Sequence, residues 1–464
     1  MTKSQTKKRK LSPYLLVLLS FAGVILLGSF LLTLPLAHKN GLWGSYLDSL
    51  FISTSATCVT GLSTYASGLE GELTYFGQAV VLVMIQIGGL GFITIFTFII
   101  SLFAKKLQFK DRLFLSQAVN SNTIAGVSKF VKRVILIVLT AETLGFLLGL
   151  PVFLNVSQYS TGKAIWVSLF TSVSAFNNAG FDLFGSLSLI RMAENPIVYG
   201  LPTWAYYYLC SYIMVLIVIG GISFITIIDL VILRKKPNQW SAFVRIVLIT
   251  TSVLLVFGFV MFVLTDVTTN HINFFEAAFQ SVTLRTAGFA TFDQNNLSSA
   301  GKAVSCLLMF IGGSPISTAG GIKTTTIFVI VLCLVRFLQR KGIYAFNREY
   351  TKSSILKATS LVFLSIFFIV IAFLSIMAIE QHCQNPNELI TSENVFFEVF
   401  SAFGTVGVTA GITSTLNVGS KVIIIALMFF GRLGPITLFQ LFQGDMDREE
   451  SVHFKRVQTD VIVG

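Results

Sequence analysis

Long apolar runs constrain this chain more than any other feature of its sequence. A run of about 20 apolar residues is long enough to cross a lipid bilayer as a helix. Runs of about this length or longer occupy residues 14–36, 205–233, 246–264 and 361–379. Charged residues make up only 12% of the 464 residues, which is about half of what water-soluble domains carry. The sequence therefore predicts an all-α polytopic membrane protein, embedded in the lipid bilayer and without a soluble domain.

The net charge of +12 follows a topological pattern. The Lys and Arg residues gather in segments 3–10, 105–133, 234–245 and 336–352, whereas the intervening connections carry acids such as Glu70. Positive charge is concentrated on the cytoplasmic side of membrane proteins. The pattern therefore predicts a multi-pass protein of the cell membrane with cytoplasmic N- and C-termini. Because topology accounts for the charge, we expect no binding of nucleic acid.

A polar stretch that contains a glycine occurs four times between the apolar runs. The stretches are TSATCVTGLSTY, SVSAFNNAGFDLF, SVTLRTAGFATF and SAFGTVGVTAGIT. Each follows a segment too short to span a bilayer but long enough for a helix of about three turns, at residues 47–56, 164–175, 274–283 and 395–403. We call the stretches the four glycine loops, and each is centred on a residue pair: Thr60 and Gly61, Ala179 and Gly180, Ala287 and Gly288, and Val406 and Gly407.

A second repeated motif follows each glycine loop, as IGGLGFIT, IGGISFIT, IGGSPIST and FGRLGPIT. We expect its Gly-Gly pairs to lie at the start of long helices and to serve close helix packing. The two repeats together predict four span–pore-helix–span units, with eight spans and four re-entrant hairpins. The units cover residues 14–104, 127–234, 243–338 and 354–442, between a cytoplasmic arm, 1–13, and a cytoplasmic tail, 443–464. Two full spans per unit give all four units the same orientation, around a pseudo-fourfold axis.

The glycine loops are the candidate ion pathway. Non-helical backbone is tolerated at membrane depth only where it is buried in protein or lines a watery cavity. Four such loops around one axis can turn their carbonyl groups inward and replace the hydration shell of a cation. Glycine permits the φ values that such a backbone needs. The alternative is that these glycines only let helices pack closely.

Three basic residues remain at membrane depth once the connections are set aside: Arg285, Lys323 and Arg432. Basic residues there are costly and are functional candidates. Arg285 belongs to the third glycine loop, and we expect it to brace the filter through a pore-helix acid or a loop carbonyl.

Lys323 lies in a Gly-rich stretch, residues 312–326, which interrupts the third unit and which we call the intramembrane loop. It contains Gly312, Gly313, Gly320 and Gly321 with Pro315, so it cannot be a continuous helix. We interpret it as a gate below the filter, held across the path by Arg432. The alternative is a kink that serves helix packing. A phosphate-binding loop is excluded because no Gly-Lys-Ser or Gly-Lys-Thr sequence is present.

The second unit departs from the pattern of the others. The short segments of the first, third and fourth units carry an acid near their start, at Asp48, Glu276 and Glu398, whereas the second carries Lys163 and Trp166. The sequence offers no explanation for this difference.

The motifs TCVTG, NNAGF, RTAGF and GTVGVT, with GGIKTTT and Arg432, resemble those of the Trk/Ktr/HKT superfamily of potassium transporters over nearly the whole chain. The chain lacks two N-terminal spans that Trk-type members usually carry, so it is most similar to the bacterial KtrB-type membrane subunit. The resemblance implies uptake of K⁺, with Na⁺ as a candidate activator and no cofactor. Glycine at all four filter positions implies K⁺ selectivity, because sodium-selective plant relatives carry serine at the first. The resemblance also implies a homodimer on a cytosolic ring of nucleotide-binding regulatory subunits.

Two other classes of function stay open at this stage. A secondary transporter with alternating access also uses broken helices, but it predicts inverted halves and intramembrane acids, of which Glu142 is the one clear case. An intramembrane enzyme requires a nucleophile with a base, or metal ligands, at membrane depth. The chain has no H-E-x-x-H, G-x-S-x-G or paired intramembrane aspartates, so we expect no enzymatic activity.

Overall fold

The computed structural model describes residues 13–91, 127–185, 188–190, 202–233, 240–346, 348–383 and 388–434. The predicted cytoplasmic tail, most of the N-terminal arm and most of the basic segment 105–133 lie outside the described residues. The described part is mostly helical. Its one sheet pairs two antiparallel strands of two residues each, β1 (Tyr344–Ala345) and β2 (Arg348–Glu349).

The helices fall into four consecutive groups. The first group holds α1 (Pro13–Thr33), η1 (Pro35–Ala37), α2 (Tyr46–Thr57), α3 (Gly68–Glu72) and α4 (Tyr75–Leu90). The second holds α7 (Val127–Leu154), α8 (Thr161–Asn177), α11 (Thr203–Gly221) and α12 (Phe224–Leu233). The third holds α13 (Ala242–Phe262), η3 (Val263–Val267), α14 (Phe274–Thr283), η4 (Gln294–Asn296), α15 (Ser299–Phe310) and α16 (Thr324–Leu338). The fourth holds α17 (Lys352–His382), α18 (Ser392–Gly404), η5 (Thr413–Thr415) and α19 (Val418–Leu433).

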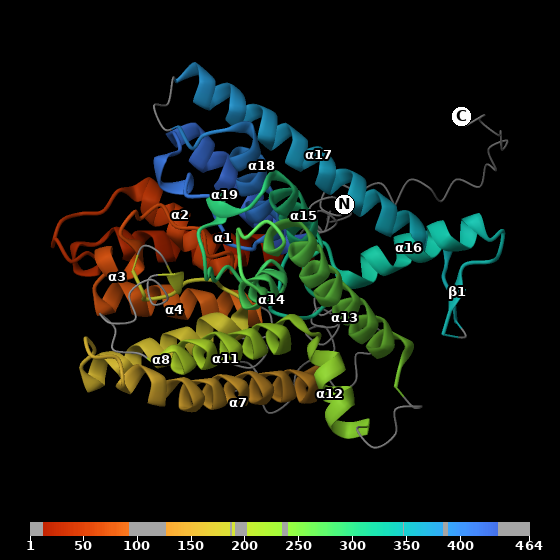
Figure 1. Cartoon of the computed structure of the whole chain (residues 1–464), viewed down its shortest axis with the longest axis horizontal. Coiled ribbons are helices and arrows are strands. Elements are labelled where there is room, and N and C mark those ends of the chain that lie inside the picture. The colour runs from red at the N-terminus through yellow and green to blue at the C-terminus, as the bar shows by residue number, and fades with distance from the viewer. Residues whose placement is uncertain are drawn as a thin grey trace, which may run out of the picture.

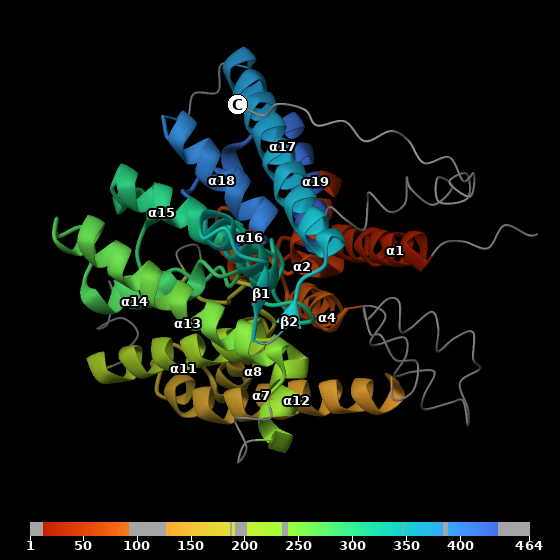
Figure 2. The ribbon, with the colours of Figure 1, turned by 90° about the vertical axis from the view of Figure 1, so that its right-hand side faces the viewer.

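The four groups surround a common centre. In Figure 2 the red first group lies at the right, the yellow second at the bottom, the green third at the left and the blue fourth at the top. In Figure 1 the second group forms the lower layer, and α17 crosses the upper edge of the molecule. Each of the short helices α2, α8, α14 and α18 buries at least half of its residues, and α2 and α8 bury every residue of their C-terminal halves.

Each of the four short helices begins at a side-chain cap. The Ser45 side chain accepts a hydrogen bond from the N–H of Asp48, and Ser160, Asn273 and Thr391 cap α8, α14 and α18 in the same way. Such a cap satisfies one of the unpaired N–H groups of the first turn. Each of these helices begins no more than three residues before its predicted start.

Four helices are long and apolar enough to cross a membrane among the described residues: Phe130–Leu154, Thr203–Gly221, Ala242–Val267 and Lys352–His382. Four shorter apolar helices accompany them: Val17–Thr33, Tyr75–Leu90, Ser299–Phe310 and Thr324–Leu338. The count of eight spans stays a prediction.

The structure corrects two expectations about the repeated motifs. The apolar run 205–233 is not one helix, because the chain breaks at Ile222 and Ser223 between α11 and α12. The Gly-Gly pairs lie at the ends of α4 and α11 and not at their starts. Their packing role is visible there, since a Cβ on Gly88 or Gly220 would collide with the carbonyl oxygen of Thr57 or Phe176 in the last turn of a short helix. Gly431 meets Phe403 in the same way.

Candidate functional site: a ring of four glycines

The four predicted glycines form one closed ring. A Cβ on Gly61 would lie 2.6 Å from the carbonyl oxygen of Ala179, and one on Gly180 would lie 2.7 Å from that of Ala287. A Cβ on Gly288 would lie 2.6 Å from the carbonyl oxygen of Val406. The ring closes because a Cβ on Gly407 would collide with the carbonyl oxygen of Thr60. Each glycine loop thus places a carbonyl group directly against the glycine of its neighbour.

The backbone repeats its conformation in all four loops. The glycines have φ values of 101°, 69°, 87° and 93° in chain order. The residue two positions before each glycine also has a positive φ, and these residues are Val59, Asn178, Thr286 and Thr405. Positive φ is rare for non-glycine residues and strained for β-branched ones. The same uncommon conformation at four sites far apart in the sequence indicates one shared structural purpose.

Hydroxyl groups of the short helices fix the loops from behind. The Ser55 and Ser401 hydroxyls each accept a hydrogen bond from the N–H of the loop glycine, at 3.1 Å in both cases. The Ser174 hydroxyl donates to the carbonyl oxygen of Phe181, and the Thr283 hydroxyl donates to that of Phe289 at 2.7 Å. These bonds fix backbone groups of all four loops to the short helices that precede them.

A cavity of about 500 Å³ opens on the ring. All four ring glycines line it. It is large enough to hold many water molecules, since one water takes up about 30 Å³ in the liquid. The four ring glycines therefore form part of the wall of this cavity.

The intramembrane loop packs against the fourth glycine loop and does not line the cavity. Residues 311–323 between α15 and α16 are non-helical. Gly321 approaches the carbonyl oxygen of Gly404, at the end of α18, because a Cβ there would lie 3.3 Å from it. A Cβ on Gly320 would collide with the side chain of Thr405 in the fourth glycine loop. The two segments are therefore in direct contact.

The same loop completes the break between α11 and α12. The N–H of Ser314 donates to the carbonyl oxygen of Gly221 at 3.1 Å, and the Thr318 hydroxyl donates to that of Gly220 at 2.9 Å. The carbonyl oxygen of Ile316 accepts from the N–H of Phe224 at 2.9 Å. An unpaired backbone group at membrane depth costs several kcal/mol, so the two broken segments satisfy each other.

Two of the predicted basic residues hold the intramembrane loop. The Arg432 guanidinium donates to the carbonyl oxygen of Thr318 and to that of Gly88 at the end of α4. The Lys323 ammonium donates to the carbonyl oxygens of Ala319, at 2.7 Å, and Gly320, at 3.3 Å. Arg432 thereby ties α19, the loop and α4 together, and its contact with the loop falls on the carbonyl group of Thr318, within residues 312–321.

Arg285 joins the third glycine loop to the intramembrane loop. Its guanidinium donates to the carbonyl oxygen of Gly312 at 3.0 Å and to that of Thr251 in α13 at 3.3 Å. Arg285 is only 7% exposed. The sequence predicted either a pore-helix acid or a loop carbonyl as the partner of Arg285. Among the described residues, its side-chain partners are carbonyl groups and not an acid. One of these carbonyls belongs to the intramembrane loop.

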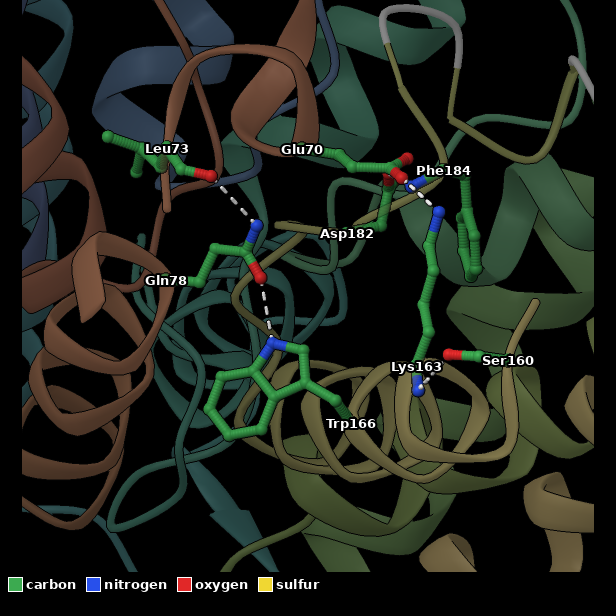
Figure 3. Close-up of polar contacts among 8 residues, drawn as sticks. All are labelled: Glu70, Leu73, Gln78, Ser160, Lys163, Trp166, Asp182 and Phe184. Atoms are coloured by element: carbon green, nitrogen blue, oxygen red, sulfur yellow. Dashed lines mark hydrogen bonds and ion pairs between the residues drawn. The ribbon is translucent and has the colours of Figure 1, made fainter. Parts of the chain in front are cut away.

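Contacts with the first unit explain why the short helix of the second unit carries Lys163 and Trp166 where the others carry an acid. The Lys163 ammonium pairs with the carboxylate of Glu70 in α3 at 2.5 Å. The Trp166 indole N–H donates to the amide oxygen of Gln78 in α4 at 2.7 Å. Figure 3 shows both contacts bridging from α8 to the first group. A comparable pair, Lys421 with Asp48 at 3.1 Å, joins the fourth group to the first.

Comparison with known proteins identifies the family of the chain. The family model of TrkH, described as a cation transport protein, matches residues 12–453. The chain belongs to the TrkH family of cation transport proteins. The match confirms the resemblance found in the motifs. It also confirms that this transporter-family chain is not an enzyme.

Two relatives and one solved structure illustrate how far the likeness extends. The chain is 33% identical over 465 residues to the potassium/sodium uptake protein NtpJ of Enterococcus hirae, with 98% of each chain covered. It is 35% identical over 437 residues to the Ktr system potassium uptake protein B of Bacillus subtilis, with 92% of each covered. The crystal structure of the potassium transporter TrkH from Vibrio parahaemolyticus matches with a TM-score of 0.69 at 19% identity, over 94% of this chain and 86% of that one. This last match shows that the fold is that of the TrkH family.

The fold reveals two polar arrangements in this TrkH-family chain: the position of Asp182 and the partners of Glu142. Asp182 follows the second ring glycine and lines the cavity. The Glu142 carboxylate in α7 accepts hydrogen bonds from the amides of Asn177, at 2.8 Å, and Gln86, at 3.2 Å. Glu142 can be recognised from the sequence as an intramembrane acid, but its partners cannot, because they lie in two other helices, α8 and α4. A single polar residue carries no periodic signal, so only the fold could reveal these neighbours.

Proposed function

We propose that this chain is the pore subunit of a K⁺ uptake system in a bacterial cell membrane. The ring carbonyls of Thr60, Ala179, Ala287 and Val406, with the glycines that follow them, form its selectivity filter. The names of the relatives support K⁺ as the substrate. The membrane potential drives uptake, since it is worth about 2.3 kcal/mol per charge for each 100 mV.

The closed ring of glycines and carbonyls is the observation that carries this proposal. Glycines that only allow close packing act between one pair of helices at a time. That role does not explain why four loops meet in a closed ring. A ring of carbonyl groups with negative potential from the C-terminal ends of α2, α8, α14 and α18 favours a cation. The cavity on one side supplies it with hydrated ions.

The intramembrane loop is the gate in this proposal. It lies directly beneath the fourth glycine loop, and Arg432 and Lys323 hold it through carbonyl groups. Release of the Arg432 contacts frees the loop to move away from the path. The four units of the pore are residues 14–104, 127–234, 243–338 and 354–442.

Regulation is assigned to a partner in this proposal. Three of the matching relatives are named as proteins of a Ktr system, which supports the expectation of a multi-subunit assembly. The chain acts as a homodimer on a cytosolic ring of nucleotide-binding subunits, with its basic cytoplasmic segments and tail as docking surfaces. Na⁺ is a candidate activator. Native mass spectrometry in mild detergent tests the dimer, and a monomer mass contradicts it.

The test of function is growth at limiting K⁺ and Rb⁺ uptake in a bacterium without its own K⁺ transporters. The wild-type chain is compared with Gly61→Ser, with and without a regulatory subunit. We expect rescue by the wild type and a loss of preference for K⁺ over Na⁺ in the variant.

Gly411→Ser is the matched control. Gly411 has a φ of 81°, so serine is equally strained there, yet its Cβ would meet no atom closer than 3.8 Å. We expect this variant to keep wild-type selectivity. Equal selectivity in wild type and Gly61→Ser contradicts the filter and favours a transporter with its site elsewhere.

A further inference from the structure

The four glycine loops differ at one equivalent position that faces the cavity. The residues two positions after the ring glycines are Ser63, Asp182, Ala290 and Thr409, and all four line the cavity. One of the four carries a charge. The ring that is symmetric in its backbone is therefore asymmetric in its electrostatics, with a carboxylate on the side of the second unit.

Neutral donors hold the Asp182 carboxylate in place. One oxygen accepts a hydrogen bond from the N–H of Phe184 at 3.0 Å, and the other accepts from the Ser188 hydroxyl at 2.5 Å. The residue is 9% exposed. These bonds orient the carboxylate without cancelling its charge.

Lys163 does not neutralise Asp182 either. The Lys163 ammonium is paired with Glu70 and also lies 4.4 Å from the ring centre of Tyr159. In Figure 3 the carboxylates of Asp182 and Glu70 lie beside each other, and the Lys163 ammonium pairs with the carboxylate of Glu70. The Lys163 ammonium is therefore committed to Glu70, and Asp182 has no ion pair among the described residues. Asp293 lines the same cavity, so the charged residues that line it in the described part of the chain are both acids.

We propose that Asp182 forms a binding site for a monovalent cation in the cavity, directly before the glycine ring. This inference rests on the proposed function and names a step within it: K⁺ is captured beside Asp182 before it enters the ring. Alkali cations prefer oxygen ligands, and the hydroxyls of Ser63 and Thr409 line the same space. A carboxylate at the mouth of a low-dielectric passage raises the local concentration of cations.

The test is the concentration dependence of Rb⁺ uptake into proteoliposomes that hold the full chain with its regulatory subunit. Asp182→Asn removes the charge but keeps an acceptor for Phe184 and a partner for Ser188. We expect its half-saturating Rb⁺ concentration to rise about fivefold at low ionic strength, with a maximal rate within about twofold of the wild type. The difference should shrink when choline chloride raises the ionic strength, because salt screens the interaction.

Asp293→Asn is the matched control, since it removes an exposed carboxylate from the same cavity. We expect its half-saturating concentration to change by less than about twofold. Glu70→Gln is the second variant, because it leaves Asp182 intact and frees the Lys163 ammonium beside it. We expect a rise of about twofold in this variant, which tests the site even where Asp182→Asn fails to fold.

Unchanged half-saturating concentrations in Asp182→Asn and Glu70→Gln, in liposomes where the wild type takes up Rb⁺, overturn the Asp182 site and leave the filter intact. An equal rise in Asp293→Asn also overturns it, because the effect then belongs to the cavity as a whole. Absence of K⁺-dependent uptake by the wild type contradicts the proposed function itself.

Discussion

The Arg432 guanidinium donates a hydrogen bond to the carbonyl oxygen of Thr318, which ties the last turn of α19 to the intramembrane loop. Its second contact, with the carbonyl oxygen of Gly88, reaches the first group. A charged donor at membrane depth makes stronger hydrogen bonds than a neutral one. Arg432 is thereby the one residue that joins the intramembrane loop to both α19 and α4 among the described residues.

Replacement of Arg432 by Ala should release the intramembrane loop. We expect faster Rb⁺ flux without the regulatory subunit and a smaller response to it, because the loop loses its contacts with α19 and α4. Flux through purified channels in liposomes measures this. Arg336→Ala is the control, because Arg336 is a half-buried charge on α16 whose side-chain hydrogen bonds, among the described residues, stay within residues 336–344. Unchanged flux and gating in the Arg432 variant remove this residue from the mechanism.

Replacement of Arg285 by Met should affect both the ring and the intramembrane loop. The variant leaves the carbonyl oxygen of Gly312 without its Arg285 donor, at a cost of about 1–3 kcal/mol for a buried group. Thr251 loses only a second donor, because its carbonyl group lies inside α13. We expect a lower melting temperature and a reduced preference for K⁺. Arg285→Lys restores one donor and should recover part of both. Full K⁺ preference in the Met variant contradicts the bracing role.

The pair of Lys163 and Glu70 should stabilise the contact between the first two groups only modestly. Both side chains are partly exposed, at 29% and 27%. A double-mutant cycle with Lys163→Met and Glu70→Gln should give a coupling energy of about 0.5–1 kcal/mol in thermal unfolding. The same cycle on Lys421 and Asp48 provides a comparison. A coupling energy near zero in both cycles shows that these pairs do not fix the arrangement of the groups.

Close packing at Gly88 should be sensitive to a single methyl group. Gly88→Ala places a Cβ against the carbonyl oxygen of Thr57, so we expect destabilisation of about 1–3 kcal/mol. Gly23→Ala in α1 is the control, since no atom lies within 4 Å of its Cβ. Alanine is the better helix former, so this variant should unfold at the same temperature or higher. Equal melting temperatures contradict the packing role of Gly88.

The sequence predicted the local features that repeat. The short helices and their glycines recur four times, and a repeated pattern stands out from composition. The structure adds that Val59, Asn178, Thr286 and Thr405 also share a positive φ. The sequence could not predict this regularity, because the four positions are occupied by three different residue types.

Features that depend on contacts between groups could not be predicted. The break at Ile222 and Ser223 lies in a predominantly apolar run, and its backbone groups are satisfied by the intramembrane loop about 90 residues later. Lys163 and Trp166 looked like exceptions because their partners, Glu70 and Gln78, belong to another group. Periodicity describes one element at a time, so pairing across elements has to come from the fold.

Anomalous diffraction from crystals soaked in Rb⁺ tests the central claim most directly. We predict a peak on the axis of the ring, coordinated by the carbonyl oxygens of Thr60, Ala179, Ala287 and Val406. Crystals of Gly61→Ser should lose or weaken that peak. An empty ring in well-ordered wild-type crystals, with Rb⁺ bound at another place within the membrane, contradicts the account.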